Sequence, residues 1–555
     1  MGSSDCRRGV RLQHTHTATR WRLNPALVLT LVCAERFSHG AAVGKTYLSQ
    51  KLCRYLNWIG YRTAVFSVGS YRRKAVGPAA PAEFFSASNP AGVKKREEVA
   101  LAALADVFTF LCTGGGEAAI YDGTNTSVER RQMVTDYVRT AGAAADVDVQ
   151  LMWLEMQTTD PSIVADNIRE AKLTSPDAAG LSPEAAQNFF MARIAEYERA
   201  YEPMGTVAGA AENDASYLVN IDCGRRVIHN NINGFIMSKI AFFVANLKVN
   251  RSPIYITRHG ESQHNVKGLI GGDPYLSPNG VQYAEALAAF IASEKTITRA
   301  ELEELSVWTS TLKRTLQTAE SLKPLGLPTT HWRALIEIQV GPMCDNMTYE
   351  EIAEKYPEEA AARKRDKLHY RYPQGGESYM DVIARIEPCI LELERMSTPI
   401  LLVVHRAVAR CLYSYFLDLP ASQIPHLDVP LHTVLKLEPK AYGCEVTRFR
   451  LAVDSCEDHG ANPASPAPTV EEQRQVASMQ ALPGAAVVMA AEEQGKERHV
   501  FIKPATGSPI SPATATAISG SSTSNSTVIP LEAPGVILSA FQTRGEQQQQ
   551  TAQQS

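Results

Sequence analysis

Residues 253–261 read Pro-Ile-Tyr-Ile-Thr-Arg-His-Gly-Glu, an apolar run that ends in an arginine and a histidine before a glycine. The pattern predicts a β-strand that delivers His259 to the carboxyl edge of an α/β sheet, where ligands usually bind. A second apolar run, residues 399–404, ends at His405 in the same way. Two imidazoles at strand ends, with Arg258 and Arg314 available, favour phosphoryl transfer through a phosphohistidine. A single such histidine would more often be structural or solvent-exposed.

Composition places the chain in the soluble globular class. Its 555 residues allow two or more domains, and 45% of them are hydrophobic and 21% charged. The net charge of −4 gives no general case for binding nucleic acid, so any anion sites must be local. Ten cysteines without a Cys-x-x-Cys pair indicate a reducing compartment, and we expect a cytoplasmic protein. No apolar run reaches the roughly 18 residues that a membrane span needs.

The chain divides into four parts. We expect a disordered extension over residues 1–25, a first domain over 26–250, a second over 251–453 and a low-complexity, disordered tail over 454–555. A basic stretch before residues 26–34 imitates a secretory signal, but a phosphate-loop sequence follows it, which favours a first sheet strand. A short strand or helix near 487–502 is compatible with the tail.

Both domains are predicted to be α/β. In the first, short apolar runs alternate with amphipathic stretches, which is typical of an open sheet of parallel strands. The expected strands are 27–33, 62–68, 117–121, 150–155 and 217–221, and the expected helices include 45–58, 95–111, 162–172, 184–202 and 227–247.

A phosphate-binding loop is expected between the first strand and the first helix. Gly44-Lys45-Thr46 fits the end of a Walker A loop, in which backbone N–H groups cradle phosphates, Lys45 reaches the β and γ oxygens and Thr46 holds Mg²⁺. The match is imperfect, because His39 stands where the motif needs its first glycine and Gly40 comes one place late.

A second strand end in the same domain carries Asp122, in the position of a Walker B carboxylate. Such a residue can also simply cap a helix. Dispersed basic residues accompany it, and beside a nucleotide loop they are plausible ligands for a phosphorylated substrate rather than merely solvated helix faces. They are Arg72, Arg73, Arg96, Arg130, Arg131, Lys172 and Arg193.

Arg-His-Gly-Glu-Ser at 258–262 looks like the histidine phosphatase superfamily, and a phosphate-loop kinase pattern precedes it. The combination resembles the 6-phosphofructo-2-kinase/fructose-2,6-bisphosphatase family over roughly residues 40–452. Its most specific stretches are 44–47, 54–60, 71–73, 100–104, 347–352, 376–379 and 430–437.

For the first domain the resemblance implies transfer of the ATP γ-phosphoryl group to the 2-hydroxyl of fructose 6-phosphate. Asp122 would be catalytic, and ATP with Mg²⁺ would be the cofactors. The nucleotide would be bound by Gly40, Gly44, Lys45 and Thr46 and bordered by Asn167 to Lys172. The sugar phosphate would be held by Arg72, Arg96, Thr124, Arg130, Lys172, Arg193 and Tyr197.

For the second domain the resemblance implies hydrolysis of fructose 2,6-bisphosphate. His259 would attack the 2-phosphate, and Glu337 would protonate the leaving oxygen and later activate water. The phosphoryl group would be clamped by Arg258, Asn265, Arg314 and His405, and Gly271 would be a further substrate-binding residue. The 6-phosphate would lie on Tyr349, Arg363, Lys367, Tyr379 and Arg410. Arg363 and Lys367, four apart on an expected helix, would share one face, although such a pair can also be a solvated basic face.

Several positions depart from the family pattern. Besides His39, Thr158 stands for a cysteine, Ala178 for a tyrosine, Arg406 for a glutamine and Leu269 for an arginine. Three alternatives therefore stay open: a phosphatase with a weakened kinase domain, a non-enzymatic sensor of ATP or sugar phosphate, and a general phosphoglycerate mutase-like enzyme. The resemblance also implies a homodimer with small-molecule substrates, without nucleic acid or membrane partners.

Overall fold

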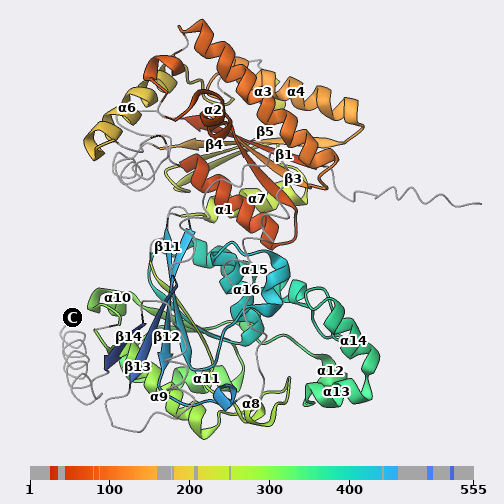
Figure 1. Ribbon diagram of the computed structural model, residues 1–555, viewed down its shortest axis with the longest axis vertical. Helices are drawn as coiled ribbons and strands as arrows, with labels where there is room; N and C mark the ends of the chain where they lie inside the picture. The colour runs from red at the N-terminus through yellow and green to blue at the C-terminus, as the bar shows by residue number, and fades with distance from the viewer. Residues whose placement is uncertain are drawn as a thin grey trace, which may run out of the picture.

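The computed structural model describes residues 26–34, 44–158 without 79 and 87, 177, 181–205, 211–248, 252–440 without 295, 443–459, 497–503 and 526–530. Two sheet-containing units follow one another along the chain, each with helices against its sheet (Figure 1). The expected fold class, two α/β domains in sequence, is confirmed. Among the described helices, none combines the length and apolar character that crossing a bilayer requires.

The N-terminal unit is a six-stranded sheet in the order β2-β3-β1-β4-β5-β6. Its strands are β1 (Ala26–Ala34), β2 (Thr63–Ser67), β3 (Ala118–Asp122), β4 (Val149–Gln157), β5 (Ser216–Ile221) and β6 (Arg226–Asn230). Its helices are α1 (Gly44–Trp58), α2 (Val68–Val76), α3 (Pro90–Cys112), α4 (Val128–Ala145), α6 (Pro183–Arg199) and α7 (Phe235–Asn246). Because β1 lies parallel to β3, the carboxyl end of β1 and Asp122 at the end of β3 lie at one edge of the sheet.

One expected helix of this unit is wrong. Residues 227–247 do not form a single helix, because Arg226–Asn230 pairs antiparallel with β5 and only Phe235–Asn246 is helical. The break has a local cause: Asn231 has φ 48° and Gly234, before the helix, has φ 85°, backbone conformations that asparagine and glycine tolerate best. The helix expected at 162–172 lies outside the described residues.

The C-terminal unit is an eight-stranded sheet in the order β14-β13-β12-β11-β7-β10-β8-β9. Its strands are β7 (Ile254–Arg258), β8 (Ser306–Thr309), β9 (Thr329–His331), β10 (Ile400–Val404), β11 (Thr433–Lys440), β12 (Gly443–Leu451), β13 (Glu497–Lys503) and β14 (Ser526–Pro530). The central pair β7 and β10 is parallel, with Arg258 opposite Val404, so that His259 and His405 leave the sheet side by side.

The helices of this unit include two that matter most for the site, α11 and α16. In chain order they are α8 (Gln263–Lys267), α9 (Pro278–Ala292), α10 (Arg299–Glu304), α11 (Lys313–Glu320), α12 (Gly341–Cys344), α13 (Tyr349–Lys355), α14 (Pro357–Arg365), α15 (Tyr379–Arg395) and α16 (Arg406–Phe416).

The tail contributes more than expected. At 454–555 we expect at most one element, near 487–502, yet β13 pairs parallel with β12 and β14 pairs parallel with β13. In addition, a short 3₁₀ turn, Cys456–His459, lies just past the expected boundary at 453 and contacts the second sheet's site residues. The remaining tail lies outside the described residues.

The two units meet through α1 and α7 on one side and α15 and α16 on the other (Figure 1). The carboxylate of Glu394 on α15 is buried there and accepts hydrogen bonds from Lys51 at 2.9 Å and Arg54 at 2.7 Å, both on α1. The indole of Trp58 donates to the Cys411 carbonyl at 3.0 Å. One continuous hydrophobic core therefore runs across both units.

Candidate active sites

The two histidines at the strand ends of the C-terminal unit share one buried site. Their ring centroids are 5.1 Å apart, and His259 and His405 are 3% and 0% exposed. The guanidinium of Arg314, on α11, lies between them: its Nε is 3.2 Å from Nε2 of His259 and 3.2 Å from Nδ1 of His405. The alternative of solvent-exposed histidines is therefore excluded.

Hydrogen bonds fix the protonation pattern of both rings. Nδ1 of His259 lies 2.7 Å from the Gly260 carbonyl oxygen and must donate its N–H to it. Nε2 is therefore the unprotonated nitrogen, which carries the ring's free lone pair. Burial, with Arg314 and Arg258 nearby, holds the pKa of His259 well below its ordinary value. The imidazole is thus neutral at physiological pH, as a nucleophile must be.

His405 carries its proton on Nε2, whereas His259 carries its proton on Nδ1. Since Nδ1 accepts from Arg314, Nε2 carries the proton and donates to Oγ of Ser310 at 2.8 Å. Burial, followed by Arg314 and His259, lowers the pKa of His405 well below its usual range. Sequence reasoning assigned no role to Ser310, because a serine in a loop carries no signal of the histidine that it contacts.

Glu337 lies in the segment before α12, and its carboxylate contacts the first residues of α16, the helix that begins directly after His405. Its carboxylate accepts from the backbone N–H groups of Arg406 and Ala407, both at 3.1 Å, where the helix N-terminus favours negative charge. Arg385 fixes this segment by donating to the carbonyls of Ile336 at 2.8 Å and Glu337 at 3.2 Å. No local motif points to Arg385, because its partners lie about 50 positions away.

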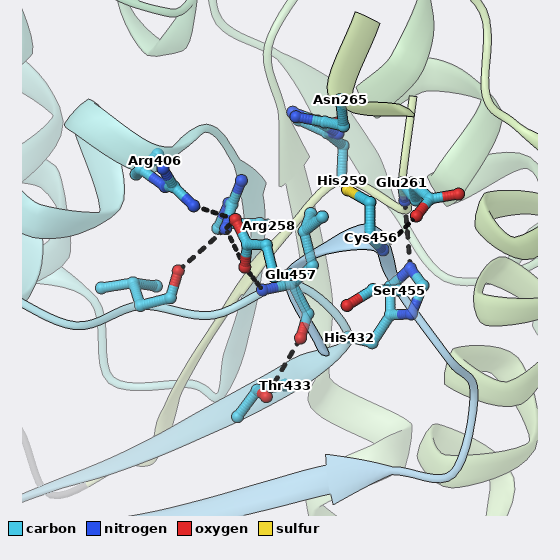
Figure 2. A network of polar contacts seen from close by, with 12 residues as sticks. Arg258, His259, Glu261, Asn265, Arg406, His432, Thr433, Ser455, Cys456 and Glu457 are labelled. Atoms are coloured by element: carbon cyan, nitrogen blue, oxygen red, sulfur yellow. Dashed lines mark hydrogen bonds and ion pairs between the residues drawn. The ribbon is translucent and has the colours of Figure 1, made fainter. Parts of the chain in front are cut away.

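Arg258 is nearly fully buried, and its Nη1 donates to the Val429 carbonyl at 3.1 Å and to Glu457 at 2.9 Å. Burial lowers the pKa of Arg258 to about 10. Figure 2 shows Glu457 between Arg258 and Arg406, to which it also bonds. Sequence reasoning missed Glu457, which lies 199 positions from Arg258 in a segment expected to be disordered.

Asn265 and Gly271 shape the rim of the same site. Oδ1 of Asn265 is used locally, since it accepts from the Ser262 backbone at 2.9 Å and hydroxyl at 2.8 Å. Gly271 has φ 73°, and a Cβ there would lie 2.0 Å from Oδ1 of Asp345. This glycine allows the turn that presents the Gly272 carbonyl to Nη1 of Arg314 at 3.1 Å.

A cavity of about 330 Å³ in the C-terminal unit is lined by the expected 6-phosphate ligands Tyr349, Arg363 and Lys367. Arg363 donates to the hydroxyls of Tyr349 at 3.0 Å and Tyr372 at 2.9 Å. One expectation is corrected: α14 ends at Arg365, so Lys367 lies in the following turn and not on the helix face of Arg363. Both side chains nevertheless line the cavity.

The remaining two expected ligands pair with one another, because Arg410 donates to the Tyr379 hydroxyl at 3.0 Å. Arg410 also influences Lys367. Burial first, then Arg363, Arg410 and Arg406, lower the pKa of the Lys367 amine to about 7. The cavity wall itself carries Arg363, Lys364 and Lys367, basic residues of the kind that a phosphate site requires.

The N-terminal unit brings its own site residues to the edge between β1 and β3. The Thr46 hydroxyl donates to Oδ2 of Asp122 at 3.2 Å, which joins the two Walker positions. Gly44 and Lys45 form the start of α1, directly before Thr46. Gly40, Asn167 and Lys172 lie outside the described residues, and Thr124 follows β3 in the adjoining loop.

Basic residues gather around Asp177, which sequence reasoning did not single out. Its Oδ2 lies 2.6 Å from Arg72 and 3.0 Å from Arg193. Burial raises the pKa of Asp177, but Arg72, Arg193 and Arg73 outweigh it and hold that pKa below its ordinary value. One buried carboxylate thus offsets part of the charge of three arginines.

Arg96, Arg130 and Tyr197 complete this cluster. Burial lowers the pKa of Arg96, Tyr197 raises it and Arg130 lowers it, which places the three groups within electrostatic range. Arg130 also acts on Tyr121, the residue before Asp122: burial raises the pKa of Tyr121 and the charge of Arg130 lowers it. Arg130 therefore links the cluster of expected sugar-phosphate ligands to the strand that carries the expected catalytic carboxylate, Asp122.

The two sites define a class of protein: a phosphate-loop kinase unit joined to a phosphohistidine phosphatase unit. Residues 40–251 match the family model 6-phosphofructo-2-kinase, and residues 254–452 match the histidine phosphatase superfamily, branch 1.

Curated relatives span both units. The chain is 46% identical over 420 residues to 6-phosphofructo-2-kinase/fructose-2,6-bisphosphatase of Gallus gallus, which covers 76% of this chain and 85% of the relative. It is 46% identical over 418 residues to 6-phosphofructo-2-kinase/fructose-2,6-bisphosphatase 3 of Homo sapiens, covering 75% of this chain and 76% of the relative. The chain belongs to the 6-phosphofructo-2-kinase/fructose-2,6-bisphosphatase family, and it is a bifunctional enzyme that makes and hydrolyses fructose 2,6-bisphosphate.

Proposed function

We propose that the C-terminal site hydrolyses the 2-phosphate through His259. Nε2 of the neutral ring attacks phosphorus, the bond from phosphorus to the sugar oxygen breaks, and Glu337, which enters this step in its protonated form, gives its proton to that oxygen and becomes a carboxylate. Glu337 then takes a proton from water as the water oxygen attacks the phosphohistidine, which releases phosphate and restores the ring. Arg314, bonded to both imidazoles, stabilises the equatorial oxygens together with Arg258 and His405.

The single observation that carries this proposal is the arrangement of Arg314 between two buried imidazoles of fixed tautomer. The guanidinium of Arg314 contacts one nitrogen of each imidazole, and it therefore lies where the oxygens of a transferred phosphoryl group would be held. The cavity lined by Arg363 and Lys367 supports binding of the substrate's second phosphate.

In the N-terminal site we propose that Thr46 would hold Mg²⁺ with ATP. The residues present fit that ion, because the Thr46 hydroxyl is a hard oxygen donor and the Asp122 carboxylate that it contacts at 3.2 Å adds negative charge beside it. When bound, Mg²⁺ neutralises phosphate charge. Asp122 accepts the proton of the fructose 2-hydroxyl, Lys45 contacts the transferred phosphate, and Arg72, Arg96, Arg130 and Arg193 orient the sugar phosphate.

Two variants assayed in both directions test this division. We expect Lys45→Ala to abolish synthesis of fructose 2,6-bisphosphate while hydrolysis continues, and His259→Ala to abolish hydrolysis and phosphohistidine trapping while synthesis continues. Wild-type ATP binding without synthesis would instead favour a phosphatase with an inactive kinase unit. If either variant stopped both activities while remaining folded, the two-site assignment would be wrong.

From the resemblance alone we also propose a cytoplasmic homodimer. Light scattering of the full chain should give a mass near twice 60.6 kDa, and a monomer mass at micromolar concentration would contradict it.

A further inference from the structure

A short turn past the end of β12, residues 455–459, returns to the phosphatase site. It is fixed at independent points: Asp458 accepts from the Ser455 backbone at 2.8 Å and pairs with Arg450 at 2.5 Å. The Cys456 backbone N–H donates to Glu261 at 2.6 Å. This turn lies beyond residue 452, where the match to the phosphatase family model ends.

The turn places one carboxylate between two arginines of the site. Both oxygens of Glu457 accept from Nη1 of Arg258, at 2.9 and 3.1 Å, and Oε1 also bonds Nη2 of Arg406 (Figure 2). Oε2 additionally accepts from the Leu431 backbone N–H at 2.9 Å. Glu457 is therefore held by the fold as well as by its two cationic partners.

The two guanidinium groups need this carboxylate. The pKa of Arg406 is lowered to about 9, with Arg258 as the largest cause and burial as the second. Like charges this close repel strongly where water is scarce. A shared carboxylate with charge-assisted hydrogen bonds offsets that repulsion and fixes the direction of both side chains.

Arg258 keeps donor capacity for a ligand. Among the described residues, no acceptor bonds its Nε, although that atom is buried. Arg258 directly precedes His259 in the chain, and its Nη1 donates a hydrogen bond to Glu457. With one edge of the guanidinium fixed by Glu457, Nε keeps an N–H that no acceptor among the described residues uses.

We propose that Glu457 is a positioning residue of the phosphatase site, which holds Arg258 and Arg406 side by side so that their remaining N–H groups face the transferred phosphoryl group. This inference rests on the proposed role of Arg258 as a phosphoryl ligand. The competing possibility is a latch, in which Glu457 occupies the place of a substrate phosphate and must leave. The latch has the opposite effect on substrate affinity.

The test measures binding and turnover separately. In the His259→Ala chain, which cannot form the phosphohistidine, calorimetric affinity for fructose 2,6-bisphosphate should fall about tenfold when Glu457→Gln is added. In the otherwise wild-type chain, Glu457→Gln should lower kcat/KM of hydrolysis by a similar factor and leave synthesis by the kinase unit unchanged. Glu392→Gln, which removes an exposed carboxylate paired with Arg395 on α15, is the matched control and should change neither activity.

A double-variant cycle separates positioning from a general structural role. Once Arg406→Gln has removed one of the two cations, adding Glu457→Gln should lower the affinity for fructose 2,6-bisphosphate by about threefold or less. Less positive charge then needs an opposing carboxylate. Tighter binding by the Glu457→Gln chain would establish the latch and overturn the proposal. Unchanged binding, or an equal loss with and without Arg406, would overturn it too. Hydrolysis that survives His259→Ala would instead refute the proposed function itself.

Discussion

At the scale of single residues, the phosphatase site depends on side chains whose charge differs from that expected in water. Desolvation and neighbouring guanidinium groups keep the pKa of His259 low and its ring neutral, which suits a nucleophile. The same physical effects act on Lys367, where they lower the pKa of an amine that should bind phosphate as a cation. The first shift assists the reaction, whereas the second makes binding depend on pH near neutrality.

Lys367 gives a prediction of pH dependence. With its pKa at about 7 in the free enzyme, the amine is charged below that pH and loses its proton as the pH rises through it. We therefore expect KM for fructose 2,6-bisphosphate to rise between about pH 7 and pH 9, and binding to take up a proton in that window. Steady-state kinetics across pH will show this directly.

Lys367→Arg is the control for that experiment, because arginine stays charged throughout the range. The variant should flatten the rise in KM, while the wild type retains it. An identical pH profile in both chains would assign the titration to the substrate phosphates or to another group.

At the scale of elements, α1 links the two units, because its first turn carries Thr46 and its later turns contact α15 and α16. Lys51 and Arg54 of α1 share the buried carboxylate of Glu394, and Tyr415 also donates to it at 2.8 Å. Burial lowers the pKa of Lys51 to about 8, so the charge of this lysine depends on the carboxylate beside it.

Removing that carboxylate should be costly. Glu394→Gln takes away the negative charge that both buried cations contact, and we expect it to lower the free energy of unfolding by about 3–5 kcal/mol. Denaturant titration will measure the change. Glu392→Gln on the same helix breaks only an exposed pair and should cost less than about 1 kcal/mol. Equal effects of the two variants would show that the buried cluster is not a strong contact.

At the scale of the whole molecule, the shared core predicts that the two units lose structure together. Apolar side chains of α1 and α7 pack in the same hydrophobic cluster as those of α15 and α16. We expect kinase and phosphatase activities to decay with the same midpoint on heating, and Glu394→Gln to shift both midpoints equally. Two separated transitions in activity or calorimetry would show that the units are energetically independent.

Local patterns determined much of this protein. Apolar runs, glycines and the residues that follow them indicated the alternating α/β order, and the same runs identified His259, His405 and Asp122 at strand ends. Parallel strands bring such ends to one edge whatever the intervening sequence contains, so these side chains could be grouped from their positions in the sequence alone. The helix expected at 227–247 was wrong. Our interpretation gave the helical periodicity of this stretch more weight than the turn residues Asn231 and Gly234, which separate a strand from a shorter helix.

Other features were decided only by the tertiary structure. Glu457 bonds Arg258 across 199 positions, Asp177 contacts Arg72 across 105, and Glu394 joins Lys51 across 343. A carboxylate's effect on a guanidinium depends on distance through space and on the water excluded around it, and neither leaves a periodic trace in the sequence. The residues that carry the chemistry could be read from local motifs, whereas those that orient them became visible only once the chain had folded.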